Sequence, residues 1–170
     1  MAQEIERKFL LRDDRWRDEA HAHYHLKQGY LTNQKNVSIR VRIDHEGRAH
    51  LNIKSYTLGI SRQEYEYDIP REDAEEILET LALKPLIDKT RYLVRHGEHV
   101  WEIDEFRGDN AGLIVAEVEL GREDEDFALP PWAGKEVSDD PRYLNSCLIQ
   151  HPYCDWPEVV RSRKRSSDKA

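Results

Sequence analysis

Residues 4–9, Glu4-Ile5-Glu6-Arg7-Lys8-Phe9, decide the fold, because charged side chains occupy every second position. Successive residues of a β-strand point to opposite faces, so Glu4, Glu6 and Lys8 would share one face. Four further segments repeat this alternation: residues 38–42, 64–66, 102–104 and 117–119. One charged face is ordinary, since antiparallel sheets often face water on one side. Five such faces, with charges of both signs, predict a sheet curled around a charged and hydrated interior.

The same alternation predicts eight strands separated by turn residues. They cover residues 3–11, 24–32, 37–44, 48–56, 62–69, 88–96, 99–106 and 113–120. Helices are expected over residues 12–20 and 71–82, and from Asp140 onward, where Pro141 takes the favoured first helical position. These elements predict an α+β domain: an eight-stranded antiparallel β-barrel, or tunnel, with a charged hydrated lumen and helices packed outside.

Length and composition narrow the class of protein. The 170 residues fit one domain, which we place over residues 1–155, followed by a polar tail over residues 156–170 that we expect to be disordered. The net charge of −8 argues against specific nucleic-acid binding and against an acidic membrane surface. The sequence shows no secretory signal after Met1 and no membrane span, and its two cysteines indicate a reducing, cytoplasmic setting. A homodimer remains open.

The expected inner face carries acids and bases together. Its carboxylates are Glu4, Glu6, Glu64, Glu66, Glu102, Asp104, Glu117 and Glu119, and its cations are Lys8, Arg40, Arg42, Lys54, Lys89 and Arg91. Burying each of these ions unpaired would cost roughly several kcal/mol, so the interior must be hydrated, ion-paired or filled by charged ligands. Clustered carboxylates suit Mg²⁺ or Mn²⁺, while Arg and Lys suit phosphate oxygens. A metal–polyphosphate complex needs both. The chain has no glycine-rich loop of the P-loop type.

At this point the residues resemble a known family. The segments at 4–8, 40–42, 53–55, 63–66, 89–92, 102–104 and 117–119 resemble, in order, the motifs of the CYTH proteins, or triphosphate tunnel metalloenzymes. The resemblance runs from Gln3 to about Ile149. Residues 28–31, 61–66 and 132–145 are most similar to the short bacterial members that hydrolyse inorganic triphosphate.

The resemblance implies a role for each inner-face residue. Metal ligands would be Glu4, Glu6, Asp104, Glu117 and Glu119, with Mg²⁺ or Mn²⁺ as the cofactor. Phosphate would be bound by Lys8, Arg40, Arg42, Lys54 and Arg91. Lys89 would lie beside the scissile phosphate, and Tyr30 would be a candidate proton acceptor. The supporting carboxylates would be Glu64, Glu66 and Glu102. A phenol has a pKa near about 10 and is a poor base at neutral pH, so a water on a second metal, assisted by a carboxylate, is at least as good a candidate.

Several functions fit such a site. The first is metal-dependent hydrolysis of a triphosphate, inorganic tripolyphosphate before nucleoside triphosphates. A class IV adenylate cyclase would use the same site, but it needs a surface that recognises the base. A thiamine triphosphatase needs a pocket for the organic cation. A non-catalytic polyphosphate- or nucleotide-binding module predicts missing metal carboxylates, whereas every expected acidic position is filled here.

Overall fold

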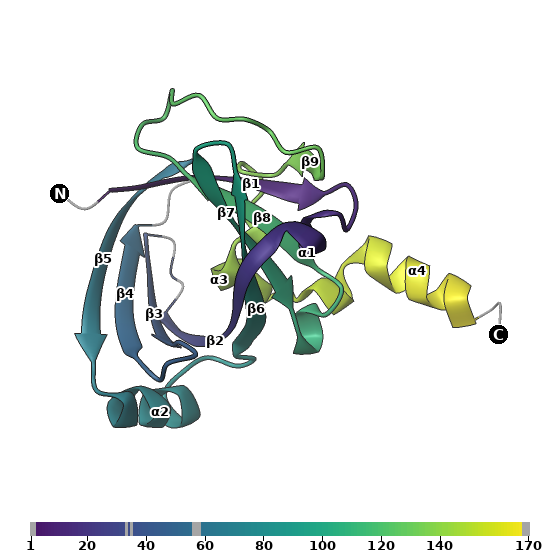
Figure 1. Cartoon of the computed structure of the whole chain (residues 1–170). Helices are drawn as coiled ribbons and strands as arrows, with labels where there is room; N and C mark the ends of the chain where they lie inside the picture. The colour runs from purple at the N-terminus through teal and green to yellow at the C-terminus, as the bar shows by residue number, and fades with distance from the viewer. Residues whose placement is uncertain (1–2, 33, 35, 56–58, 168–170) are drawn as a thin grey trace.

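The computed structural model describes residues 3–32, 34, 36–55 and 59–167, and antiparallel strands dominate this part of the chain (Figure 1). The strands are β1 (Gln3–Leu11), β2 (Ala20–Thr32), β3 (Val37–Ile43), β4 (Ala49–Ser55), β5 (Ser61–Ile69), β6 (Ile87–His96), β7 (His99–Phe106), β8 (Ile114–Glu119) and β9 (Ala133–Glu136). The helices are α1 (Trp16–Glu19), α2 (Arg71–Thr80), α3 (Asn145–Leu148) and α4 (Pro157–Ser167), with 3₁₀ turns η1 (Gly108–Asn110), η2 (Pro141–Tyr143) and η3 (Tyr153–Asp155). Tyr56, the expected end of the fourth strand, lies outside the described residues, as do residues 1–2 and 168–170.

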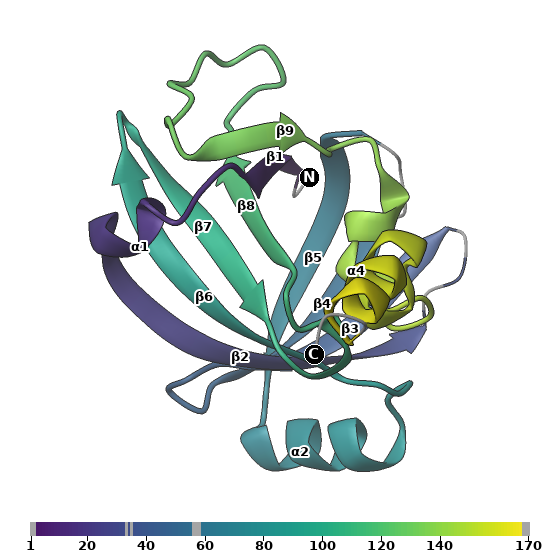
Figure 2. The same ribbon diagram turned by 90° about the vertical axis from the view of Figure 1, so that its right-hand side faces the viewer.

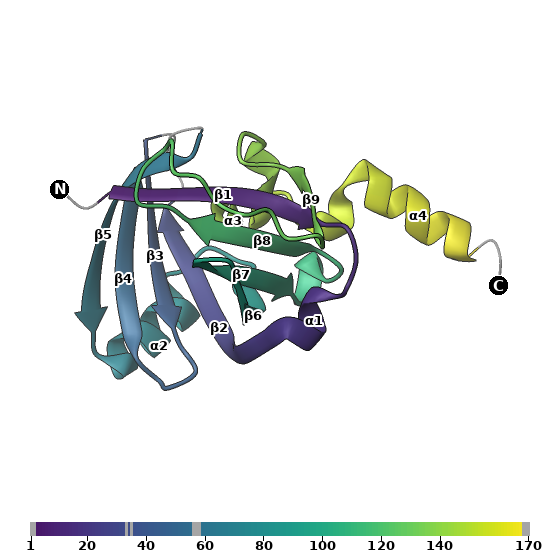
Figure 3. The same cartoon turned by 45° about the horizontal axis from the view of Figure 1, so that its top comes forward.

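Strand β1 closes the sheet into a ring. The strand order is β5-β4-β3-β2-β6-β7-β8-β1-β9, and β5 also pairs with β1. One edge of β1 pairs with β8, while its other edge pairs with β5 near Glu4 and with β9 near Phe9. Figures 2 and 3 show the resulting curved wall from two further sides. The prediction of an antiparallel tunnel is confirmed.

Several strands carry apolar residues on their outward faces, and other elements cover them; β5 differs, because its Tyr65 and Tyr67 are exposed. Trp101 and Val118 lie in a buried cluster with Trp132, which belongs to the segment that crosses the outside of β7 and β8. On the opposite side, α2 packs Leu78 against β3 and β4. On the neighbouring strand β2, Gly29 lets Leu78 come close, because a Cβ there would lie 2.8 Å from the side chain of Leu78. These two hydrophobic clusters therefore lie outside the ring, which leaves much of the inside available for charged groups.

At one end of the ring the inward face changes from charged to apolar. Phe106 follows Asp104 by two residues, and Ile87 precedes Lys89 by two, so each pair shares a strand face. Phe106 and Ile87 are buried in one cluster with Leu148 of α3. This apolar plug closes one end of the interior, a feature that the charged alternation did not predict.

Three shorter elements differ from the sequence prediction. Strand β9 was not expected; Gly134 brings it so close to β1 that a Cβ would lie 3.1 Å from the carbonyl oxygen of Leu10. Helix α1 covers only part of the predicted segment 12–20. The helix expected from Asp140 is divided into η2 and α3, because Leu144 between them is extended, with a ψ of 134°.

The C-terminal segment also differs. In place of the disordered tail expected over residues 156–170, the structure has helix α4, which projects away from the ring (Figure 1). Its start is fixed by Trp156, which is buried against Tyr143 and Tyr153. Glu158 in the first turn and Lys164 in the last turn suit the helix dipole. Among the described residues, no helix combines the length and the apolar character that crossing a membrane requires.

Candidate active site

A cavity of about 240 Å³ lies inside the ring, and most of the residues that line it are charged. The predicted site residues that line it are Glu4, Glu6, Lys8, Tyr30, Arg40, Arg42, Lys54, Glu64, Glu66, Lys89, Arg91, Glu102, Glu117 and Glu119. Of the predicted set, Asp104 alone does not line the cavity. The charged residues come from strands that are far apart in the sequence, so ring closure is what brings them together.

Strand register brings acids of β1 and β8 face to face. Glu6 is the direct partner of Glu119 across the two strands. Like charges opposite each other destabilise a sheet. Burial raises the pKa of Glu119, and the charges of Glu4, Glu6 and Glu64 raise it further. A cation among these carboxylates would relieve the repulsion.

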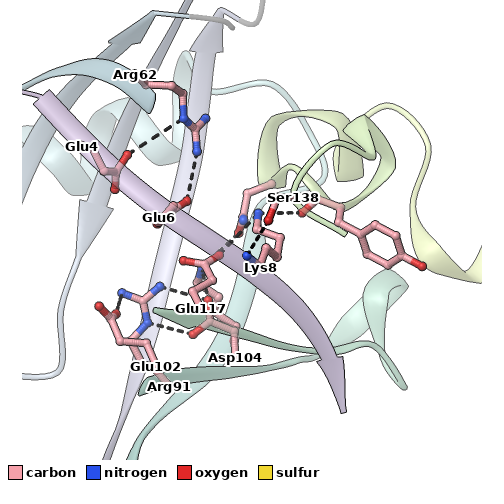
Figure 4. Close-up of polar contacts among 12 residues, drawn as sticks. Glu4, Glu6, Lys8, Arg62, Arg91, Glu102, Asp104, Glu117 and Ser138 are labelled. Atoms are coloured by element: carbon pink, nitrogen blue, oxygen red, sulfur yellow. Dashed lines mark hydrogen bonds and ion pairs between the residues drawn. The ribbon is translucent and has the colours of Figure 1, made fainter. Parts of the chain in front are cut away.

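The donors in this cluster fit a hard divalent cation. They are carboxylate oxygens, and neither His nor Cys is among the described residues that line the cavity. As the side chains stand, no three His, Cys, Asp or Glu groups of the described chain are placed to hold an ion together. Glu4 instead pairs with Lys54 at 2.9 Å. Glu6 pairs with Arg62 at 3.1 Å (Figure 4). The residues therefore suit Mg²⁺ or Mn²⁺, provided that these two cations move aside.

Two arginines of β3 face the cavity with unused donors. The Nε atoms of Arg40 and Arg42 are buried and have no hydrogen-bond partner among the described residues. Burial lowers the pKa of Arg42, and the nearby charges of Arg40 and Arg91 lower it further. Two neighbouring guanidinium groups whose Nε donors have no acceptor suit a multivalent anion.

Asp104 lies behind the cavity wall and joins two cations. Its Oδ2 lies 2.8 Å from Nζ of Lys89, and its Oδ1 accepts a hydrogen bond of 2.8 Å from Nε of Arg91. Although burial alone would raise it, Arg91 and Lys89 hold the pKa of Asp104 well below its usual range. Asp104 thus fixes both cations toward the interior, and its expected metal binding stays a prediction.

Lys89 is the most deeply enclosed cation of the site. Burial lowers the pKa of Lys89 to about 8, even though Asp104 opposes this change. Nζ of Lys89 also donates to Oδ1 of Asn145, at the start of α3, over 3.0 Å. Asn145 accepts a second hydrogen bond of 3.2 Å from Gln28. Helix α3 therefore positions the ammonium group that sequence analysis assigned to catalysis.

The three carboxylates predicted as supporting groups each contact a polar partner. Glu66 lies 3.9 Å from Arg42, and Glu102 forms an ion pair with Arg91. Burial raises the pKa of Glu102 despite this pairing. Glu64 accepts a hydrogen bond of 2.6 Å from Nδ2 of Asn52.

Sequence analysis missed several cavity residues. Arg62 and Ser38 line the cavity, and each lies two positions before a predicted member of the same strand face. Strict use of the alternation would have found both. Leu144, Asn145 and Ser146 come from the segment that closes one end, and no strand periodicity marks them.

Comparison with known proteins agrees with this architecture. A family model described as the CYTH domain matches residues 2–147. The chain belongs to the CYTH family. It is 45% identical to an inorganic triphosphatase of Acetivibrio thermocellus over 158 residues, which cover 93% of this chain and 100% of the relative. It is 38% identical to an inorganic triphosphatase of Nitrosomonas europaea over 149 residues, or 85% of this chain and 95% of the relative.

A solved structure supports the same assignment. This CYTH chain superposes on the crystal structure of the inorganic triphosphatase NE1496 with a TM-score of 0.63 and 33% identity, covering 88% of this chain and 95% of that one. The resemblance noted in the alternating motifs is confirmed, and so is the tunnel fold expected of a CYTH protein.

Proposed function

We infer that this CYTH protein hydrolyses inorganic triphosphate, with a divalent cation bound among the carboxylates of the tunnel. The observation that carries this inference is the cavity lining, in which arginines and lysines face clustered glutamates. An anion made only of phosphates can bind the arginines and lysines directly and the glutamates through a divalent cation. Tyr30 and Leu144 are the less polar members of the described lining, which offers a nucleobase little apolar surface. The named activity of the two relatives agrees with this inference.

The proposed roles follow from the contacts. Glu4, Glu6 and Glu119 would hold the cation, since they crowd one another on β1 and β8. Arg40 and Arg42 would bind phosphate oxygens with the donors that are unused in the described structure. Glu117 stays a proposed metal ligand, and Lys8, Lys54 and Arg91 stay proposed phosphate-binding residues. A bound Mg²⁺ or Mn²⁺ would supply Lewis-acid charge and a water of lowered pKa.

Lys89 would stabilise the charge that develops at the scissile phosphate. Its Nζ is held by Asp104 and Asn145, so the ammonium group is oriented before the substrate arrives. Tyr30 lines the same cavity. Its phenol is an alternative to a metal-bound water as the group that takes part in proton transfer. A Tyr30→Phe variant separates the two roles, since loss of turnover assigns the proton transfer to the phenol and retention assigns it to the water.

The direct test is phosphate release by the purified protein. We expect release from tripolyphosphate with Mg²⁺ or Mn²⁺, faster than from ATP, and none with a chelator. Glu6→Gln should lower turnover about 10- to 150-fold, the equivalent of one charge-assisted contact of about 1.5–3 kcal/mol. Glu98→Gln, in an exposed turn, is the control. Equal slow release from both substrates, or release that the chelator leaves unchanged, would show the inference to be wrong.

A further inference from the structure

Arg62 contacts the two acids that we propose as metal ligands. It lies on β5, where its Cα is the register partner of Glu4 at the closure of the ring. Its Nη2 donates to Oε1 of Glu6 over 3.1 Å, and its Nε lies 4.0 Å from Oε2 of Glu4 (Figure 4). All three side chains are largely buried, with exposures of 13–15%. The guanidinium therefore neutralises β1 acids where water screens little.

This contact sets Arg62 apart from the arginines of β3. Arg40 and Arg42 keep an Nε without a partner among the described residues, and Glu66 lies 3.9 Å from Arg42. Arg62, in contrast, donates to Glu6 over 3.1 Å. Burial opposes it, but the charges of Glu6 and Glu4 raise the pKa of Arg62 above its ordinary value. Arg62 therefore stays charged and is bound to the acids of β1. In this arrangement its guanidinium is not free to bind phosphate.

A divalent cation and this guanidinium cannot share Glu4 and Glu6 without strong repulsion. Arg62 has space into which it can turn. It lines the main cavity, which has a volume of about 240 Å³. The main cavity is where the triphosphate would lie, so a displaced guanidinium could reach phosphate oxygens.

We propose that Arg62 couples metal binding to triphosphate binding: it holds Glu4 and Glu6 in the free protein, and it exchanges them for substrate phosphate when the cation enters. The inference rests on the proposed function. This exchange would make the substrate-free protein bind the metal weakly and the complex with triphosphate bind it strongly. Two binding events that share one displaced group are positively coupled, by the same factor in either order.

Binding of Mn²⁺, measured by electron paramagnetic resonance of the free ion, tests this directly. Arg62→Met removes the competing charge, so we expect Mn²⁺ to bind the substrate-free variant about tenfold more tightly. The nonhydrolysable analogue bis(methylene)triphosphate should raise Mn²⁺ affinity in the wild type, and about tenfold less in the variant. Arg62→Gln, which keeps a donor for Glu6, should change in the same direction and serves if Arg62→Met does not fold.

Arg7→Met is the matched control, because Arg7 pairs with Glu136 on the outer face of β1, the strand that carries Glu4 and Glu6. It should bind Mn²⁺ as the wild type does. Unchanged or weaker Mn²⁺ binding by both Arg62 variants would overturn the inference, as would tighter binding with undiminished coupling. If either result is found while the wild type hydrolyses triphosphate normally, the coupling through Arg62 is rejected and the proposed function stands. A wild type that neither binds Mn²⁺ nor hydrolyses triphosphate rejects the proposed function.

Discussion

Replacing Asp104 by asparagine tests whether the ion network behind the cavity holds its cations in place. Asp104 is 1% exposed, and its oxygens contact Lys89 and Arg91 at 2.8–3.0 Å. Asparagine has the same shape without the charge. Removing one partner of a buried ion pair typically costs about 3–5 kcal/mol, since the remaining charge is left uncompensated.

The two cations respond differently to this loss. With a pKa of about 8, Lys89 holds its proton at pH 7 by only about 1.4 kcal/mol, so its share of the loss is limited to that value. Arg91 cannot release a proton. It loses the charge on an acceptor of two hydrogen bonds, each contributing about 1.5–3 kcal/mol, although the amide oxygen of the asparagine would still accept one and Glu102 remains. We expect a total of about 3–4 kcal/mol at pH 7, within the range for a broken buried ion pair.

The part of the lost unfolding free energy that comes from Lys89 depends on pH. In the wild type Lys89 is charged below about pH 8 and neutral above it, whereas without Asp104 it loses its proton at lower pH. The difference in unfolding free energy between wild type and variant therefore falls as pH rises through 8. At pH 9 it should be smaller by about 1 kcal/mol than at pH 7.

Urea unfolding with a chelator present measures this difference without any metal contribution. Glu105→Gln is the control, because Glu105 lies on the same strand but pairs with Arg17 on the outside. That variant should lose no more than about 1 kcal/mol. A loss below about 1 kcal/mol for Asp104→Asn at pH 7, or an equal loss at both pH values, would refute the reasoning.

Three further predictions concern other parts of the molecule. Glu136→Gln should lower the unfolding free energy by about 0.5–1 kcal/mol at pH 7 and less at pH 3, as measured by urea titration, because hydrogen bonds from Arg7 lower the pKa of Glu136 and this stabilisation is lost as pH falls. Arg40→Ala should raise the KM for triphosphate about tenfold with little change in melting temperature, since its Nε has no described partner to lose. Asn145→Ala should lower kcat about tenfold and leave KM nearly unchanged, because Lys89 loses the acceptor that orients it. Equal changes in kcat and KM would contradict this positioning role.

Much of the fold could be predicted from residue alternation, because a strand has only two faces. The periodicity that puts Glu4 and Glu6 on one face also puts Ile5 and Phe9 on the other, and both placements hold in the structure. Elements without periodicity escaped prediction. Strand β9 has four residues, one of them Gly134, and depends on pairing with β1 instead of on its own pattern.

Part of the site likewise exceeded what the pattern could predict. Which face a charged residue takes is a local property, whereas its partner depends on ring closure and register. Arg62 is placed beside Glu4 by the pairing of β5 with β1, across 58 residues of chain. Asn145 reaches Lys89 only because α3 packs into one end of the ring.

By itself, the sequence determined that acids and bases alternate with apolar residues on at least five strands, and hence that charge would gather on one side of a sheet. Only the tertiary structure decided which acid meets which base, that Asp104 lies behind the wall and not at the cavity, and that one end is closed by apolar side chains. The physical reason is range: alternation is fixed by the backbone of each strand, whereas contacts between strands depend on a closure that no single segment encodes.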